Sequence, residues 1–435
     1  MRTGRFPGAL LAVLPALSLA GVSIPDTPPG HALSAWLDAF NSADRARAES
    51  FDKTYAWGTN LDDFAGWMTE TGGYDLLDVY ANDQTTIFFR VKARTNGGEE
   101  VGRVTVTATA PVAVTELGTW RIPVGAKVDV MKLDAAARSE VIKRVAGAFD
   151  SAYVYPEIGR KMSADLRKRY ARGEYRSALY GIDLARELTR DLQQISHDKH
   201  VEVRFSFFAR PAELSTTQSG AEARRLAVNN CGFQKAEHLQ PNVGYLKLDM
   251  FADAAICGHT ASAAMNLLAD SDALILDLRD NHGGGGGMVE YLATYLFAKR
   301  TRLDDMYSRT ESATTETWTL SDVPGKRFIG KPVFVLTSKQ TFSAAEYLAN
   351  VLRNLKRATL IGETTMGGAH TVETRRIDDH FSARVPSGRP ITKTDWEGTG
   401  VEPDVKVAAD QALDAALKLA ADAINKNRSD LAAGR

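Results

Sequence analysis

The sequence has little of the features that would place it in a specialised class of protein. Among its 435 residues only two are cysteine, and 53 basic against 54 acidic side chains leave a formal net charge of −1. A net charge so close to zero gives no electrostatic reason to expect nucleic acid or an anionic membrane as a partner. We find no internal repeat, low-complexity tract or long run of like charges. With 44% hydrophobic and 25% charged residues, the composition is that of an ordinary globular protein.

Long apolar runs are also scarce, and the one with a clear meaning lies at the N-terminus. Arg2 and Arg5 precede an apolar run over residues 9–20, and the small residues at its end fit cleavage by signal peptidase. The run is too short for a comfortable membrane span, and Pro15 interrupts it. We therefore predict a signal peptide over residues 1–20 and a periplasmic or secreted protein without stable membrane insertion. The alternative is an uncleaved membrane anchor.

The two cysteines, Cys231 and Cys257, do not have the spacing of a metal site, and we assign them no catalytic role. In an exported protein they can pair in a disulfide. The alternative is a pair of buried free thiols, which cysteine's preference for the interior allows. The sequence leaves both alternatives open.

The length of the chain predicts two or three domains. Residues 21–30 are rich in proline and glycine and are interpreted as a linker. Helical stretches followed by alternating β-branched runs predict a small α+β domain over residues 31–125, whose pattern resembles the nuclear transport factor 2-like domains. Residues 134–205 have helical periodicity. Residues 206–240 are polar, are predicted to be loop-like and leave too little chain for an inserted PDZ domain. They open the predicted peptidase core over residues 206–425, whose remainder alternates strands and helices.

A serine stands where one of these strands meets a helix. The buried strand 333–337 is followed by a turn with Ser343 and then by helical periodicity. The N–H groups of a helix's first turn are unpaired and partly positive, so they can stabilise an oxyanion that forms beside this serine. The alternative is that Ser343 only caps the helix, since serine is common at helix starts.

A run of five glycines, Gly283–Gly287, follows the strand 273–279. A phosphate-binding loop requires a lysine and a hydroxyl residue after the glycines, and Met288 stands there instead. We therefore expect no nucleotide cofactor. Glycines allow main-chain N–H groups to approach a ligand closely, so this loop can supply half of an oxyanion hole, with the N–H of Ala344 as the other half. The alternative is a merely flexible loop.

Four motifs in this order resemble the successive signatures of one enzyme family: DLRDNHGG at 277–284, TFSAAE at 341–346, GETTMGG at 362–368 and GVEPD at 400–404. The family is that of the tail-specific, or C-terminal processing, serine peptidases. Within it the chain is most similar to the branch that includes the tricorn core and the repeats of interphotoreceptor retinoid-binding protein. The resemblance extends over residues 134–425.

The resemblance implies a ClpP/crotonase-like α/β core with a helical N-terminal subdomain. It implies that Ser343 is the nucleophile and that the N–H groups of Ala344 and of Gly283 or Gly284 form the oxyanion hole. The processing-peptidase branch uses a Ser–Lys dyad, and the position of that lysine corresponds to Gly368 here. The dyad is therefore absent from this chain.

A serine hydroxyl needs an adjacent base to become a nucleophile near neutral pH. The tricorn-like branch has a histidine at the position of His200, which we predict to be the general base. Glu397 is the predicted distal carboxylate, and Glu402 is its neighbouring alternative. Further candidates near the site are His197, His370 and Lys199, the last of which replaces the serine of the tricorn pattern.

These observations predict an exported serine peptidase that cleaves protein or peptide substrates through an acyl-enzyme and requires no metal or cofactor. The alternative is a catalytically weak or inactive ligand carrier, because the retinoid-binding relatives use the same scaffold and function depends on the site rather than on the fold. The sequence predicts neither a substrate preference nor an oligomeric state.

Overall fold

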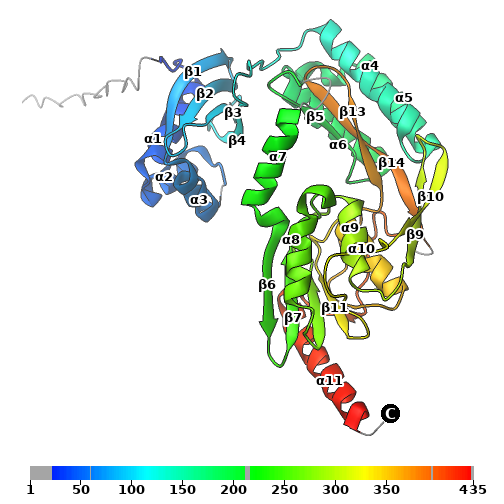
Figure 1. The fold of residues 1–435 in the computed structure, drawn as a ribbon. Helices are drawn as coiled ribbons and strands as arrows, with labels where there is room; N and C mark the ends of the chain where they lie inside the picture. Colours follow the sequence, from blue (N-terminus) through cyan, green and yellow to red (C-terminus); the bar gives the residue numbers. More distant parts are fainter. Residues whose placement is uncertain (1–21, 59, 211–215, 393–394, 433–435) are drawn as a thin grey trace, which may run out of the picture. The chain divides into compact units, whose positions relative to one another are not determined.

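The computed structural model describes residues 22–58, 60–210, 216–392 and 395–432, which form two compact units (Figure 1). The first unit ends at Lys132 and also includes Phe207–Ala209; the second contains Leu133–Ser206 and the chain from Arg210 onward. The predicted signal peptide lies outside the described residues. No helix in the described part of the chain is long and apolar enough to cross a membrane.

The first unit consists of three helices followed by an antiparallel sheet whose strands are neighbours in chain order. The elements are α1 (Pro28–Ser42), α2 (Arg45–Tyr55), α3 (Leu61–Thr71), β1 (Tyr74–Asn82), β2 (Thr86–Ala93), β3 (Glu99–Val106) and β4 (Val114–Arg121). The helix α1 begins inside the segment 21–30 that was interpreted as a linker. Two prolines at its first positions are compatible with a helix start, and the Thr27 side chain accepts a hydrogen bond from the N–H of Gly30.

Aromatic side chains fill the interior of the first unit. Trp36 and Phe40 on α1 are buried, and the Trp36 ring lies 5.8 Å from that of Phe89 on β2. Phe207 joins this unit from a distant part of the sequence and packs on Phe88 and Trp120, with ring centroids 5.9 and 5.0 Å away. These rings are core residues, and the likeness to nuclear transport factor 2 stays a prediction.

The second unit opens with three helices and a short strand: α4 (Ala135–Ala152), α5 (Pro156–Ala171), α6 (Gly181–Ser196) and β5 (Glu202–Phe205). The helix α6 buries Leu184, Leu188 and Leu192 at helical spacing. It ends at His197, whose φ of 54° is left-handed, so that the chain turns sharply into β5. The strand β5 pairs with β14 (Phe381–Ile391) in a five-stranded sheet that also contains β9 (Arg302–Ser308), β10 (Ala313–Trp318) and β13 (Thr371–Arg376).

The second unit also contains a six-stranded sheet in the order β15-β12-β11-β8-β7-β6, of which β6, β7 and β11 are labelled in Figure 1. Its strands are β6 (Phe233–Leu239), β7 (Val243–Leu248), β8 (Ala273–Asp277), β11 (Val333–Thr337), β12 (Thr359–Gly362) and β15 (Val405–Lys406), and all pairs except β6 with β7 are parallel. The central strands β8 and β11 are buried along their whole length. Because they are adjacent and parallel, the two segments that follow them leave the sheet side by side.

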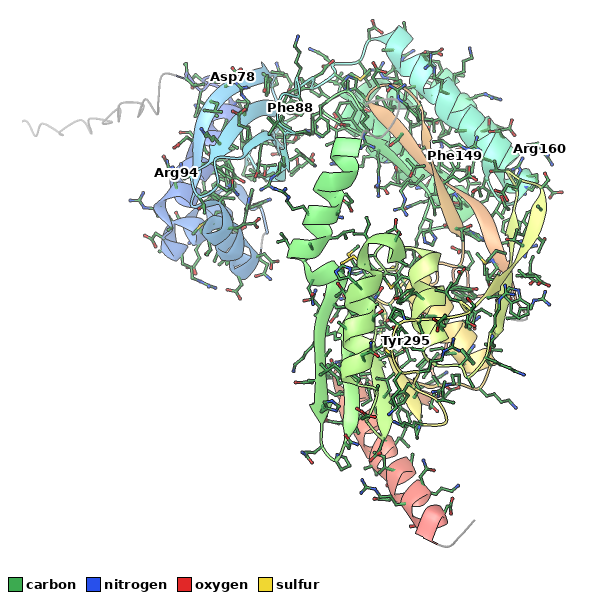
Figure 2. All side chains as sticks on the ribbon, in the orientation of Figure 1. Asp78, Phe88, Arg94, Phe149, Arg160 and Tyr295 are labelled. Atoms are coloured by element: carbon green, nitrogen blue, oxygen red, sulfur yellow. A yellow bond between two sulfur atoms is a disulfide. The ribbon has the colours of Figure 1, made fainter. Side chains whose placement is uncertain are left out.

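Alternate residues of these strands belong to two different apolar cores, as expected for a sheet that is covered on both faces. On one face the core includes side chains of α8 (Ala254–Leu267), α9 (Gly286–Thr294) and α10 (Ala344–Asn354). On the other face α11 (Ala412–Ala432) contributes Ala412, Ala416, Ala420 and Ile424. The buried hydroxyl of Tyr295, labelled in Figure 2, donates to the hydroxyl oxygen of Ser262 on α8 at 2.9 Å. The mostly parallel sheet with helices on both of its faces confirms the predicted mixed α/β class.

The segment 206–240 was predicted to be loop-like, and this prediction was wrong. It contains α7 (Thr216–Val228) and the edge strand β6. Polar residues are tolerated in β6 because only one of its edges pairs, with β7, and much of it faces solvent. The hairpins β9–β10 and β13–β14 were not predicted. The strands β9, β10 and β13 are half-exposed and lack a strong apolar alternation. The strand β14 is mostly buried, but it contains two prolines and a glycine, which are more typical of turns. The ClpP/crotonase-like classification and the absence of a PDZ insertion stay predictions.

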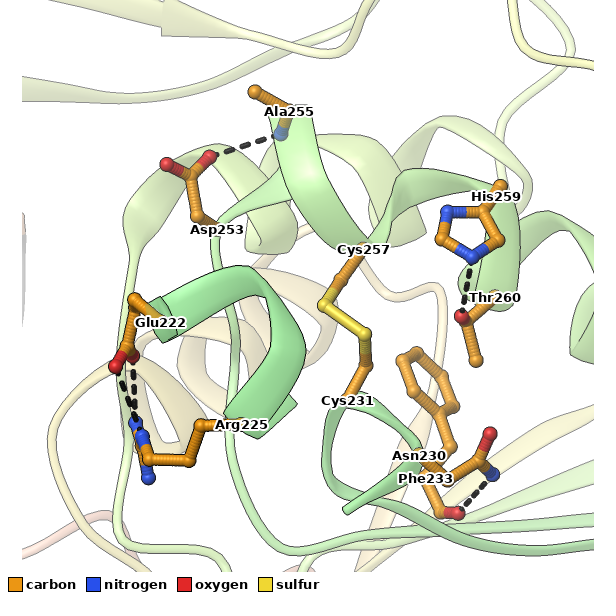
Figure 3. Close-up of a disulfide and its surroundings, with 10 residues drawn as sticks. All are labelled: Glu222, Arg225, Asn230, Cys231, Phe233, Asp253, Ala255, Cys257, His259 and Thr260. Carbon is orange, nitrogen blue, oxygen red and sulfur yellow. Dashed lines mark hydrogen bonds and ion pairs between the residues drawn. A yellow bond between two sulfur atoms is a disulfide. The ribbon is translucent and has the colours of Figure 1, made fainter. Parts of the chain in front are cut away.

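A disulfide joins Cys231, just before β6, to Cys257 on α8 (Figure 3). The Cα atoms are 5.8 Å apart, and both side chains are buried. Nearby, the Asp253 carboxylate caps α8 by accepting from the N–H of Ala255 at 2.9 Å. Of the two alternatives, a disulfide or a pair of free thiols, the structure thus has the disulfide.

Replacing both cysteines by alanine should lower the free energy of unfolding by about 3 kcal/mol, because a cross-link between residues 26 apart restricts the unfolded chain. Urea denaturation of Cys231→Ala/Cys257→Ala against the parent measures the difference. Reduction of the parent protein is the control and should produce a similar shift. A double variant as stable as the oxidised parent would contradict the expectation.

Candidate active site

Ser343 lies in the turn between β11 and α10, where it is the residue before the first helical position. Its φ of 55° and ψ of −119° place a residue with a side chain in a region that mainly glycine adopts, at a cost of about 1–3 kcal/mol. The loop after β8 lies against this turn. A Cβ added to Gly283 would be 2.6 Å from the Cβ of Ser343 and 3.1 Å from the nitrogen of Ala344, so only glycine fits there.

Some of the main-chain N–H groups around Ser343 already have a hydrogen-bond acceptor, and others do not. The N–H of Gly283 donates to the side-chain oxygen of Asn281 at 2.8 Å. For the N–H groups of Gly284 and Ala344, we find no acceptor in the part of the chain that the structure describes. Ala344 opens α10, where N–H groups lack partners within the helix. Two unpaired donors therefore lie close to the serine turn.

Glu346 connects the serine turn to the loop after β12. One carboxylate oxygen accepts from the N–H of Ser343 at 2.8 Å and from that of Gly368 at 2.7 Å. The other accepts from the N–H of Gly367 at 2.7 Å and from the hydroxyl of Thr365 at 2.5 Å. Burial raises the pKa of Glu346, while these four hydrogen bonds act in the opposite direction. The carboxylate thereby holds α10 and the loop in one geometry.

Gly368 is the position at which the resemblance to the processing peptidases would place the lysine of a Ser–Lys dyad. A Cβ added to Gly368 would lie 2.2 Å from the Phe342 ring and 2.7 Å from Cε1 of His200. The space of that side chain is therefore filled by Phe342 and His200. A lysine side chain at this position would have room only if these two rings moved.

The His200 imidazole is buried and stacks on the ring of Phe342, the neighbour of Ser343, with centroids 4.4 Å apart. Neither ring nitrogen of His200 has a hydrogen-bond partner among the described residues, and none joins it to Ser343. Burial lowers the pKa of His200 to about 4, so the imidazole is neutral at physiological pH and able to accept a proton.

Beside His200 lies a cluster of the buried Asp198 and His370 and the partly buried Glu397. Nδ1 of His370 is 2.6 Å from Oδ2 of Asp198 and 3.5 Å from Oε2 of Glu397. The hydroxyl of Tyr153 also donates to Oδ2 of Asp198, at 3.2 Å. Glu397 accepts from the N–H of Ala369 at 2.6 Å. No contact joins Glu397 to His200 among the described residues, so the predicted distal carboxylate lies against a different histidine.

The cluster displaces the pKa values of its members in different directions. Burial would raise the pKa of Asp198, but the hydrogen bond from His370 and the charges of both histidines hold it below its usual value. Burial opposes protonation of His370, yet the bond to Asp198 and the charge of Glu397 raise its pKa. Burial and the negative charge of Asp198 raise the pKa of Glu397 to about 7.

One donor atom from each of Asp198, His370 and Glu397 lies within 4.8 Å of the others, so these residues are the candidates for holding a metal ion. At a tetrahedral zinc site with bonds near 2.0 Å, ligand atoms are about 3.3 Å apart. The separation of 2.6 Å between His370 and Asp198 is that of a hydrogen bond instead. The cluster therefore fits proton exchange better than metal binding.

The remaining candidates lie outside the cluster. His197 is exposed at the end of α6. Glu402 is exposed and pairs with Lys406 at 3.3 Å. Lys199 is exposed, and its ammonium donates to the carbonyl of Met366 at 2.5 Å, next to the loop that Glu346 holds.

Sequence reasoning assigned no role to Asp198, Glu346, Phe342 or Tyr153. Asp198 precedes the predicted base by two residues and Glu346 is part of the serine motif, so the sequence could have pointed to both. The sequence could not have pointed to the roles of Phe342 and Tyr153, because these depend on contacts between distant segments.

Replacement of Glu346 by glutamine should lower the free energy of unfolding by about 2–3 kcal/mol, because the new amide group faces buried N–H donors that need an acceptor. Urea denaturation measures the change. Glu402→Gln is the matched control at the surface and should stay within about 0.5 kcal/mol of the parent. Equal stability of Glu346→Gln and Glu402→Gln would contradict this role.

Glu397 should make the stability of the protein depend on pH. Its pKa of about 7 in the folded state lies above the usual 4.5, so the folded state binds the extra proton between these values. The contribution of the protonated carboxyl is complete below about pH 4.5 and is lost as the pH rises through about 7. Glu397→Gln imitates the protonated form, and should be more stable than the parent by about 1–3 kcal/mol at pH 8 but not near pH 5. Denaturation at both pH values measures this, and a difference independent of pH would contradict it.

Comparison with known proteins gives two family matches. Residues 242–407 match peptidase family S41, and residues 127–234 match the N-terminal domain of peptidase S41 in eukaryotic IRBP. Carboxyl-terminal-processing peptidase 1 of Arabidopsis thaliana chloroplasts is 29% identical over 178 residues, which are 40% of this chain and 35% of that protein. Peptidase 2 of the same organism is 31% identical over 197 residues, 44% of this chain and 37% of that protein. The chain thus spans little more than a third of these curated relatives.

Among solved structures, the photosystem II D1 C-terminal processing protease has a TM-score of 0.41 and 16% sequence identity, covering 63% of this chain and 94% of that one. The two family matches cover more than half of this chain between them and include the predicted nucleophile. They confirm the resemblance that the four sequence motifs predicted, and the chain belongs to peptidase family S41.

Proposed function

We propose that the protein is an exported serine peptidase that cleaves peptide bonds through an acyl-enzyme on Ser343. The observation that carries this proposal is the serine turn itself. Ser343 is held at a positive φ before α10, the glycine loop packs against it, and the N–H groups of Ala344 and Gly284 are unpaired nearby. A strained serine beside unpaired backbone donors suits attack on a carbonyl carbon.

In the proposed reaction the Ser343 hydroxyl attacks the substrate carbonyl while His200 takes its proton. The N–H groups of Ala344 and Gly284 donate to the resulting oxyanion. Gly284 is preferred to Gly283, because the N–H of Gly283 already donates to Asn281. The protonated His200 then gives its proton to the leaving amine, and a water molecule activated by the same imidazole releases the acid from Ser343.

The neutral state of His200 supports its role as the base, since a protonated imidazole could not accept the serine proton. The base and nucleophile are not hydrogen-bonded in this structure. Such contacts are often long without substrate and shorten in the reacting complex. The stacking of His200 on Phe342 keeps the imidazole next to the serine turn.

The second candidate function is a ligand carrier on the same scaffold, with little or no catalysis. The observation in its favour is that both nitrogens of His200 are unpartnered, so Ser343 is not visibly activated. An organophosphonate probe discriminates the two, because it labels only an activated serine.

The same proposal includes export to an oxidising compartment. Its support is the apolar N-terminal segment together with the disulfide Cys231–Cys257, since disulfides persist mainly outside the cytosol. The substrates proposed are proteins or peptides, and no cofactor takes part in the proposed steps.

Ser343→Ala should reduce kcat by on the order of 10³-fold or more, because it removes the proposed nucleophile. Cleavage of a peptide library by the purified mature protein, followed by kinetics on a selected peptide, measures this. The matched control is Ser321→Ala, which removes the hydroxyl of an exposed serine and should leave kcat unchanged. Organophosphonate should label the parent and Ser321→Ala but not Ser343→Ala. Full activity of Ser343→Ala would exclude the mechanism.

A further inference from the structure

We propose that Asp198 is the carboxylate that positions and stabilises His200, and that His370 fixes this carboxylate in place from its other side. The inference rests on the proposed function, because it concerns the base of that reaction. Asp198 lies two residues before His200, in the turn that joins α6 to β5. It acts through His200 and is therefore a positioning residue.

The two oxygens of Asp198 face different histidines. Oδ1 accepts from the main-chain N–H of His200 at 2.8 Å and lies 3.7 Å from Nδ1 of the same residue. Oδ2 pairs with Nδ1 of His370 at 2.6 Å and accepts from the hydroxyl of Tyr153 at 3.2 Å. The carboxylate is fully buried, so these contacts fix its orientation. It cannot turn toward solvent without losing all four.

This geometry assigns the two nitrogens of His200. Nδ1 is the nitrogen that faces Asp198, so it carries the hydrogen in the reactive form, and Nε2 keeps its lone pair for the serine proton. At 3.7 Å the pair is too far apart for a hydrogen bond in the resting state. When His200 takes the proton of Ser343, the imidazolium is attracted to the buried negative charge, and its formation becomes easier.

His370 keeps Asp198 in its charged form. Without a partner, burial would favour the protonated carboxyl, which would offer His200 no negative charge. The short bond from His370 and the hydroxyl of Tyr153 offset that cost. Glu397 in turn lies 3.5 Å from Nδ1 of His370, so its negative charge favours the protonated imidazole.

Glu397 is less suited to be the direct partner of His200. Its carboxyl is bound to the N–H of Ala369 and faces His370, with no contact to His200 in the described structure. Asp198, His370 and Glu346 all influence its ionisation, and near neutral pH it is only partly charged. A carboxylate with a lowered pKa, such as Asp198, is a constant counter-ion over the same range.

The experiment compares kcat and KM of Asp198→Asn with those of the parent protein on one peptide substrate. Asparagine retains the size of the side chain but removes its charge, so kcat should fall by about 10²–10⁴-fold while KM changes less than about threefold. The rate of Ser343 labelling by organophosphonate should fall in parallel. The matched control is Asp191→Asn, on α6. Asp191 is equally buried, accepts from Tyr175 at 2.9 Å and lies outside the cluster.

A second comparison tests the link to His370. His370→Ala removes the donor to Asp198 and should lower kcat on the order of 10²-fold. His370→Asn offers an amide N–H near the position of Nδ1 and should recover kcat to within about tenfold of the parent. If His370 had a purely structural role, the two variants would have the same kcat once both are folded. Thermal unfolding checks that they are folded.

The outcomes separate this inference from the function on which it rests. If Ser343→Ala is inactive but Asp198→Asn keeps kcat within about twofold, the peptidase stands and the role of Asp198 is overturned. The inference is also overturned if Asp191→Asn and Asp198→Asn lose kcat equally, or if His370→Asn recovers nothing. If a chelator abolishes activity and Zn²⁺ restores it, Asp198, His370 and Glu397 form a metal centre, and the inference of a hydrogen-bonded cluster is overturned. If Ser343→Ala is fully active, the proposed function itself fails.

Discussion

The buried carboxylate of Glu346 is the constraint on which the rest of the site depends. It lies in the first turn of α10 and binds both the N–H of Ser343 and the loop at Gly367 and Gly368. Because four donors converge on it, only an ionised carboxylate has enough acceptor sites to satisfy them. Glu346 binds the N–H of Ser343, whereas the N–H of the next residue, Ala344, is unpaired because Ala344 opens the helix. Glu346 thus fixes the serine turn next to a free donor that the helix start supplies.

The two buried histidines of the site show how distance to one carboxylate decides the protonation of an imidazole. His370 is 2.6 Å from Asp198, and this contact raises its pKa despite burial. His200 is 3.7 Å from the same carboxylate, and burial dominates, so its pKa falls to about 4. When the pKa values of neighbouring groups are shifted in opposite directions, one side chain can accept a proton while the other holds a charge. The site therefore contains one imidazole whose pKa is lowered and one whose pKa is raised.

The sequence predicted the parts of the site that depend on short continuous segments. Ser343 and the glycine loop follow two apolar strands, and parallel pairing of β8 with β11 brings them together. The partner of Glu397 could not be predicted, because it depends on how the segment around residue 397 folds against His370. The spacing of residues along the chain does not indicate which histidine the Glu397 side chain will face. The weakly apolar edge strand β6 was missed for a related reason, since its pairing rather than its composition defines it.

The absence of a side chain at Gly368 is what allows His200 and Phe342 to lie as they do. A Cβ at this position would be 2.2 Å from the Phe342 ring and 2.7 Å from Cε1 of His200. Any larger residue would therefore force the ring or the imidazole to move. The glycine thus keeps open the volume in which the proposed base and its stacking partner meet.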